Sequence, residues 1–231
     1  MSHRENITRI KAVYNALEEL KREVVFVGGA TVSLYADRKG EEVRPTNDVD
    51  ILIELLNYKG YQQLEDKLRE KGFSNDQESK IICRYKVLGI VVDVMPTSDE
   101  ILGFSNKWYK QGFATAMDYQ LEPEGNVNYI IRIFKPEYFI ATKLEAFKNR
   151  GKADGRTSSD FEDIVYVLNN RTTIWQELNN ADKDVRDYLH KSFTELINNI
   201  YLDEWIDANM DFSEKGRTKF IIDNIRQFAS L

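Results

Sequence analysis

Residues 48–53 read Asp-Val-Asp-Ile-Leu-Ile, a short run in which two carboxylates alternate with apolar side chains. Because the side chains of a β-strand point alternately to opposite faces, Asp48 and Asp50 share one face, whereas Val49 and Ile51 point into a core. Two negative charges at neighbouring positions of one face repel each other unless a cation lies between them. The run therefore predicts a half-buried strand with a cation-binding face.

A third carboxylate interrupts another apolar run. Residues 90–95 read Ile-Val-Val-Asp-Val-Met, with Asp93 in the fourth place. A carboxylate buried without a partner costs on the order of several kcal/mol, so we expect Asp93 to join Asp48 and Asp50 as a metal ligand from an adjacent strand. Three carboxylates around two divalent ions form the arrangement of two-metal phosphoryl transfer. Alternatively, Asp93 is an edge-strand charge that blocks aggregation, and one Asp-x-Asp is a weak signal among 38 acidic residues.

A glycine pair, Gly28-Gly29, follows the apolar run 24–27 and precedes a short helix predicted over 30–36. Glycines let the backbone approach a phosphate closely, and a helix N-terminus offers unpaired N–H groups. The hydroxyl of Thr31 adds a donor. The alternative is an ordinary tight turn, and the sequence has neither a Gly-x-Gly-x-x-Gly pattern nor a Walker loop.

The amino-acid composition limits the kinds of catalytic and metal-binding site that the chain can form. With one cysteine and two histidines in 231 residues, the chain has no disulfide framework, cysteine-rich zinc site or multi-histidine metal site, and a Ser-His-Asp triad is disfavoured. Carboxylates prefer hard cations such as Mg²⁺ or Mn²⁺. The net charge of -6 argues against a general DNA binder. Without an apolar run long enough for a signal peptide or a membrane span, we expect a cytoplasmic protein that does not enter the membrane.

The spacing of apolar residues changes along the chain. Mixed strand and helix signals, including a strand pair over 81–87 and 90–94 joined at Leu88-Gly89, occupy residues 1–135. From Pro136 onward the spacing is helical throughout. We therefore predict an α/β (α+β) fold, with a mixed sheet flanked by helices in 1–135 and an all-helical region in 136–231.

A basic stretch opens the helical region. Five cations lie within fourteen residues: Lys143, Lys148, Arg150, Lys152 and Arg156. A triphosphate needs such donors, although a solvated helix face is the plainer interpretation. Two acids three residues apart, Asp160 and Asp163, follow on the next predicted helix, where complementing the helix dipole is the plainer interpretation of Asp160.

The order of these motifs resembles that of the DNA-polymerase-beta-like nucleotidyltransferases. The matching segments are Val-Gly-Gly-Ala at 27–30, Arg-Pro-Thr-Asn-Asp-Val-Asp-Ile-Leu-Ile at 44–53 and Val-Asp-Val at 92–94. The Arg-x-Thr-x-Asp-x-Asp wording is similar to one subgroup, the AbiEii/AbiGii-type toxins, whose helical lysine, basic stretch and Asp-x-x-Asp correspond to Lys143, Arg150 and Asp160 with Asp163. The resemblance covers roughly residues 24–170. The interval between the glycines and Asp48 is several residues longer than in that family, with the excess in 37–42.

This resemblance implies a metal-dependent transfer of a nucleoside monophosphate from an NTP to an acceptor, with release of pyrophosphate. It implies two Mg²⁺ or Mn²⁺ ions on Asp48, Asp50 and Asp93, of which Asp93 also acts as general base. The implied catalytic set is Asp48, Asp50, Asp93, Lys143 and Asp160. The implied nucleotide-binding set is Gly28, Gly29, Thr31, Arg44, Thr46, Lys143 and Arg150.

The acceptor stays open. The resemblance to toxins implies a tRNA, protein or small-molecule acceptor and a possible antitoxin partner. One alternative is an antibiotic-modifying nucleotidyltransferase, and another is a non-catalytic nucleotide- or partner-binding module on the same fold. The aromatic residues of the last sixty positions are expected to form a helical core, with a partner interface as the alternative. They include Trp175, Tyr188, Phe193, Trp205 and Phe212.

Overall fold

The computed structural model describes residues 2–38, 42–55, 57–103, 105–150, 154–211 and 216–230. The chain divides into two compact units. The first contains Met1–Thr31 and Glu42–Lys135, and the second contains Val32–Glu41 and Pro136–Leu231. The predicted fold class, a mixed sheet flanked by helices followed by a helical C-terminal region, is confirmed.

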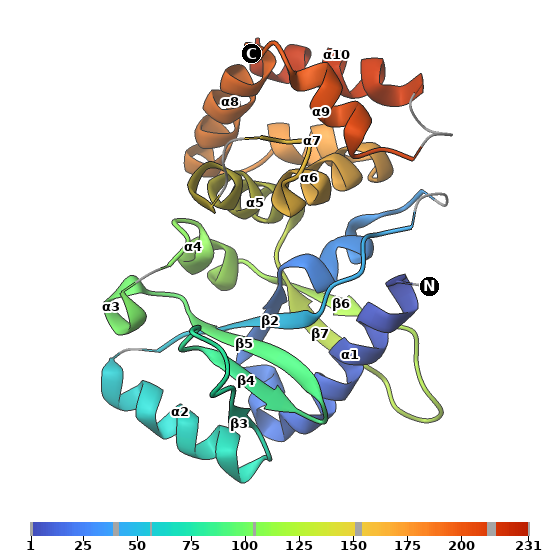
Figure 1. Ribbon diagram of the computed structural model, residues 1–231. Coiled ribbons are helices and arrows are strands. Elements are labelled where there is room, and N and C mark those ends of the chain that lie inside the picture. The colour runs from blue at the N-terminus through green and yellow to red at the C-terminus, as the bar shows by residue number, and fades with distance from the viewer. Residues whose placement is uncertain are drawn as a thin grey trace. The chain divides into compact units, whose positions relative to one another are not determined.

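The first unit is built around one mixed sheet (Figure 1). Its strands in the described residues are β1 (Val24–Val27), β2 (Asp48–Ile53), β3 (Ser74–Asn75), β4 (Arg84–Val87), β5 (Ile90–Pro96), β6 (Met117–Gln120) and β7 (Ile130–Ile133). Their order across the sheet is β3-β4-β5-β2-β1-β7-β6. The pairs β2–β5 and β1–β7 are parallel and the other neighbours are antiparallel. Strands β2 and β5 therefore lie side by side in the interior of the sheet.

Helices accompany this sheet in the same unit. They are α1 (Ser2–Ala16), the 3-10 helix η1 (Glu18–Arg22), α2 (Tyr58–Glu70), α3 (Asp99–Leu102) and α4 (Tyr109–Ala114). Helix α1 packs against β2 and β5, burying Ile10 and Val13. A positive φ of 50° at Glu18 ends the regular helix, so the first helical stretch is divided into α1 and η1. The side chain of Asn57 caps α2 by accepting a hydrogen bond from the Gly60 N–H at 3.0 Å.

The hairpin between β4 and β5 sets a register on which the site depends. Leu88 and Gly89 have φ angles of 52° and 77°, and Val87 pairs with Ile90 across them. Two left-handed residues in a two-residue loop give the turn that matches the twist of a hairpin. The predicted strand pair is therefore present, but the first strand begins at Arg84 because residues 81–83 form a turn.

The second unit is helical in its described residues apart from loops. Its helices are α5 (Pro136–Arg150), α6 (Ser159–Asn170), α7 (Ile174–Asn179), α8 (Lys183–Ile197), α9 (Leu202–Ala208) and α10 (Thr218–Ala229). Trp175, Phe193 and Phe228 pack together, with ring centroids 5.6–6.2 Å apart. Trp205 packs edge-on against two phenylalanines of α5 and α6. Phe193, Trp205 and Phe228 are buried and belong to the expected core, whereas Trp175 and Tyr188 are partly exposed and Phe212 lies outside the described residues.

One segment departs from the predicted boundary between 135 and 136. The 3-10 helix η2 (Gly29–Tyr35) begins in the first unit, but Val32–Glu41 belongs to the second. The ring of Tyr35 lies 4.4 Å from that of Phe139 on α5, and the N–H groups of Asp37 and Arg38 donate to the carbonyl of Asn170. This segment is grouped with the second unit because its apolar and backbone partners lie on α5 and at the end of α6.

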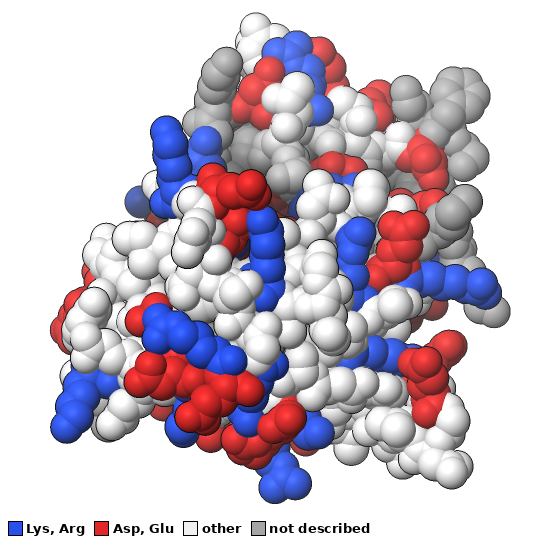
Figure 2. Space-filling model, turned by 60° about the horizontal axis from the view of Figure 1, so that its bottom comes forward, with Lys and Arg blue, Asp and Glu red and all other residues white. Residues whose placement is uncertain are grey.

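Figure 2 shows how charged side chains are distributed on one face of the molecule. On the face drawn in Figure 2, basic and acidic side chains lie next to one another in several places. The ion pairs of the first unit include those of Lys71 with Glu18 and Glu19 at 2.8 and 2.7 Å. None of the described helices combines the length and the apolar character that crossing a membrane requires.

Candidate functional site

Three carboxylates converge on one face of the first unit's sheet. In the parallel pair β2–β5, Asp50 and Asp93 are directly opposite each other, and Asp48 precedes Asp50 by two positions. Val49 and Ile51, on the other face, are fully buried, as predicted. Because β5 lies between β4 and β2, Asp93 is not an edge-strand charge, and that alternative is wrong. Asp48, Asp50 and Asp93 thus lie on the same face of two adjacent strands, and their convergence around a metal ion stays a prediction.

Arg84 on β4 holds two of these carboxylates. Its Nε and Nη2 donate to the two oxygens of Asp93 at 2.7 and 2.8 Å, and Nη2 also donates to Asp48 Oδ2 at 3.0 Å. The bidentate contact to Asp93 raises the pKa of the Arg84 guanidinium, so the cation stays charged at all physiological pH values. The buried carboxylate of Asp93 is therefore compensated by an internal cation.

Arg84 is not among the residues predicted for the site, although the sequence contains a signal for it. With Leu88 and Gly89 as a two-residue turn, residues at equal distances on either side must pair, which puts Arg84 opposite Asp93. The next pair toward the strand ends is hydrogen-bonded, since Val94 N–H donates to the Cys83 carbonyl at 2.8 Å. Arg84 and Asp93 thus occupy a non-hydrogen-bonded position, where cross-strand side chains approach most closely.

The aspartates of this site also influence the nearby thiol of Cys83. Burial, followed by the charges of Asp93 and Asp50, raises the pKa of the Cys83 thiol to about 11. A thiol that keeps its proton at neutral pH is a poor nucleophile, so Cys83 is a packing residue rather than a catalytic one.

The glycine turn is required by the side chains of the site. Gly28 has a φ of +73°, and a Cβ added there would collide with the carboxylate of Asp50. A Cβ on Gly29 would lie 2.6 Å from both Arg44 Nη2 and Thr46 Cγ2. The two glycines therefore let the loop before β2 and the Asp50 carboxylate approach the end of β1. Their predicted contact with a phosphate stays a prediction.

Two predicted nucleotide ligands have partners within the first unit. The hydroxyl of Thr31 donates to the Gly28 carbonyl at 2.9 Å, and the residue is buried. The hydroxyl of Thr46, also buried, lies 3.1 Å from Asn6 Oδ1 on α1, and the Thr46 carbonyl accepts from Arg9. These contacts hold the glycine turn and the loop before β2, so a role for either hydroxyl in nucleotide binding stays a prediction. The unusually long interval at 37–42 falls partly outside the described residues.

The second unit contains a separate charged cluster. Lys143 on α5 lies 3.1 Å from Asp160 Oδ1 and 2.6 Å from Asp163 Oδ2 on α6. All three residues are buried. Asp160 and Asp163 share one helix face because they are three residues apart, so both reach the same ammonium group. Asp160 therefore does more than complement the dipole of α6.

The other predicted cations of this unit differ in their surroundings. Lys148 donates to Ser192 and Glu195, which favours the plainer interpretation of a structural helix face for this residue. Arg150 is exposed at the end of α5, and Lys152 lies outside the described residues. Seven residues separate Arg150 from Lys143, about 10 Å along the same side of the helix.

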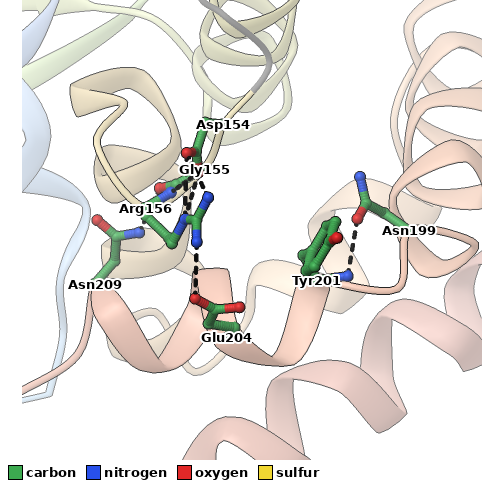
Figure 3. A network of polar contacts seen from close by, with 7 residues as sticks. All are labelled: Asp154, Gly155, Arg156, Asn199, Tyr201, Glu204 and Asn209. Atoms are coloured by element: carbon green, nitrogen blue, oxygen red, sulfur yellow. Dashed lines mark hydrogen bonds and ion pairs between the residues drawn. The ribbon is translucent and has the colours of Figure 1, made fainter.

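Polar contacts anchor the loop that leads into α6 (Figure 3). Arg156 donates to Asp154 and, at 3.0 Å, to Glu204 on α9. Asn209 Nδ2 donates to the Gly155 carbonyl at 2.8 Å, and a Cβ on Gly155 would lie 2.7 Å from the ring of Trp205. Arg156 therefore anchors this loop. The loop in turn fixes the start of α6, the helix that carries Asp160 and Asp163.

The aspartate face has the right chemistry for a hard divalent cation. It presents carboxylate oxygens from two adjacent strands, partly open to solvent, with side-chain exposures of 35% at Asp48 and 11% at Asp93. The carboxylates already have one cationic partner, because Arg84 donates hydrogen bonds to Asp93 and Asp48. In the described residues as they are arranged, no three acidic, histidine or cysteine side chains are grouped to share one metal ion. The donors fit Mg²⁺ or Mn²⁺, provided that the carboxylates turn away from Arg84.

Two comparisons with known proteins give no match. No protein-family model matches the chain, and no curated protein matches its sequence.

Proposed function

We propose that this protein is a metal-dependent nucleotidyltransferase that moves a nucleoside monophosphate from an NTP to an acceptor and releases pyrophosphate. The observation that carries the proposal is the pairing of Asp50 with Asp93 across β2 and β5, with Asp48 on the same face. A sheet interior rarely keeps three carboxylates together unless they bind a cation, because each buried charge must be compensated.

In the proposed reaction, the acceptor oxygen attacks the α-phosphorus of the NTP, and the bond to the bridging oxygen of pyrophosphate breaks. Asp48, Asp50 and Asp93 would hold Mg²⁺ or Mn²⁺, which when bound neutralises the charge of the triphosphate and of the leaving pyrophosphate. Asp93 lies deepest of the three and is proposed to take the acceptor proton. Both of its oxygens accept from Arg84, so proton transfer requires at least one of these contacts to open.

The glycine turn contributes by positioning. It brings the end of β1 against Asp50 and leaves no room for a side chain between them. Gly28, Gly29, Thr31, Arg44 and Thr46 would contact the nucleotide in this proposal, as would Lys143 and Arg150. Each of these contacts is a prediction of the family resemblance, and Asp160 is a predicted catalytic residue on the same basis.

An isosteric charge removal tests the proposal. The full-length protein is incubated with α-labelled NTPs, Mg²⁺ or Mn²⁺, and three acceptor classes: tRNA, protein and cationic small molecules. We expect label transfer to one class, and a loss of at least about a hundredfold in Asp48→Asn, corresponding to about 2.7 kcal/mol of transition-state stabilisation. Asp118→Asn is the matched control, because Asp118 is an exposed strand aspartate of the same unit. Equal labelling by wild type and Asp48→Asn would refute the assignment.

A non-catalytic binding module is the second candidate. It is favoured by the contacts of Arg84, which compensate two of the carboxylates without any metal. The same experiment separates the two functions, since a binding module would retain the NTP in the presence of Mg²⁺ and transfer no label to any acceptor class.

A further inference from the structure

We propose that Arg84 is a positioning residue that takes the place of a cation: it holds Asp48 and Asp93 together in the metal-free protein and yields Asp48 when a divalent ion binds. This inference rests on the proposed function, because it concerns the same carboxylates. It adds a residue that none of the sequence motifs contains.

The first step is a count of charge. The three aspartates bring three negative charges to one face of adjacent strands, and Arg84 returns one positive charge through three hydrogen bonds. The side chain of Arg84 is 22% exposed, so its contacts are formed in a partly dry environment where charge pairs are strong. The single charge of the guanidinium is shared between the two carboxylates that it contacts, whereas a divalent ion brings two positive charges to the same oxygens.

The second step concerns the oxygen atoms. Both oxygens of Asp93 and Oδ2 of Asp48 accept N–H groups from Arg84. A metal ion uses the same lone pairs, and its charge repels a guanidinium at contact distance. Guanidinium and metal therefore compete for these carboxylates.

The third step identifies the contact that yields first. Asp93 is held by two short hydrogen bonds directly across the hairpin, whereas Asp48 is held by one bond of 3.0 Å. Asp48 is also the more exposed partner, with 35% of its side chain accessible against 11% for Asp93. The Asp48 contact is therefore the weaker one. Its release frees an N–H of Arg84 on the face where an anionic substrate would bind.

The test measures metal binding rather than turnover. Full-length wild type, Arg84→Met and Lys86→Met are titrated with Mn²⁺ without nucleotide, following free Mn²⁺ by electron paramagnetic resonance. We expect Arg84→Met to bind Mn²⁺ at least about tenfold more tightly than wild type, because the competing charge is gone. Lys86 is the matched control, since it lies on the same strand two residues away but pairs with Asp76 and Glu78. Lys86→Met should bind as wild type does.

Thermal unfolding supplies a second readout. In EDTA, Arg84→Met should unfold at a lower temperature than wild type, because Asp48 and Asp93 both lose the guanidinium that they contact. Saturating Mg²⁺ should remove most of this difference, whereas the loss of a merely structural ion pair would persist at all Mg²⁺ concentrations. Should Arg84→Met fail to fold, Arg84→Lys keeps the charge without the bidentate geometry, and we expect it to bind Mn²⁺ about two- to threefold more tightly.

The outcomes separate the inference from the function on which it rests. If wild type binds Mn²⁺ and Asp48→Asn does not, but both Arg84 variants bind no more tightly than wild type, the metal site stands and the role of Arg84 is refuted. If wild type and both Arg84 variants all fail to bind Mn²⁺, the metal site, the proposed function and this inference are refuted together.

Discussion

Gly28 shows how closely the site is built at the level of single residues. Its positive φ is one that L side chains adopt at a cost of roughly 1–2 kcal/mol, and the space beyond its Cα is filled by the carboxylate of Asp50. Two separate requirements therefore call for glycine at this position: the positive φ of the backbone and the space taken by the Asp50 carboxylate.

Gly28→Ala tests the second requirement. We expect the free energy of unfolding, measured with urea in EDTA, to fall by at least about 1 kcal/mol more than in Gly72→Ala, because an overpacked site must move its neighbours. Gly72 is the matched control, since it has a φ of +83° in the same unit and nothing within 4 Å of an added Cβ. Equal losses in the two variants would mean that Asp50 moves aside at no cost.

A residue's place in the site could be predicted where its own stretch of sequence determines which way its side chain points. Asp48 and Asp50 were predictable because alternation along one strand decides their face. Arg84 required the pairing between two strands, which one charged residue in a strand does not reveal. The hydroxyls of Thr31 and Thr46 were interpreted as nucleotide donors, yet they contact Gly28 and Asn6, neighbours that only the fold brings within reach.

At the scale of elements, α6 depends on how its first turn is anchored. The Ser158 side chain accepts the Phe161 N–H at 3.3 Å, and the preceding loop is held to α9 by Asn209 and by contact with Trp205. Asp160 and Asp163 therefore reach Lys143 from a helix whose start has little freedom.

Gly155→Ala should weaken this anchor. A methyl group 2.7 Å from the indole of Trp205 forces the ring or the loop to move, and we expect a loss of about 1–3 kcal/mol in the free energy of unfolding, measured by urea titration. Gly216→Ala, in the same unit with open space around its Cα, should change stability by about 0.5 kcal/mol or less. A loss in Gly155→Ala no larger than in this control would contradict the packing argument.

Long, periodic elements were predictable and short ones were not. The helices of the second unit follow from the spacing of their apolar residues, because each buries one side in the same core. Strand β3 has only two residues, both exposed, so it carries no pattern of its own and exists because β4 pairs with it.

At the scale of the whole molecule, the chain enters the second unit twice, so a single boundary does not describe its path. The predicted division near Pro136 agrees with where the chain finally enters the second unit, but an earlier excursion was not predictable from composition. Its key residue, Tyr35, is fully buried against Phe139, more than a hundred positions away in the sequence.

Removal of the Tyr35 ring should therefore destabilise the second unit. We expect Tyr35→Ala to lower the free energy of unfolding by about 3–5 kcal/mol, the usual range for deleting a large buried aromatic side chain. Tyr201→Ala should cost about 1 kcal/mol or less, because that side chain is half exposed. Chemical denaturation of the full chain checks both, and similar losses would show that the excursion contributes little.

The turn at Leu88 and Gly89 has a consequence for how the protein is made in the cell. Arg84 and Asp93 are nine positions apart in one hairpin, and hairpins form in microseconds, long before distant strands meet. The most deeply buried acid of the site thus acquires its counter-charge from its own strand neighbour while the chain is still being synthesised. Assembly of the sheet then needs no metal ion, and the proposed ion would bind after the protein has left the ribosome.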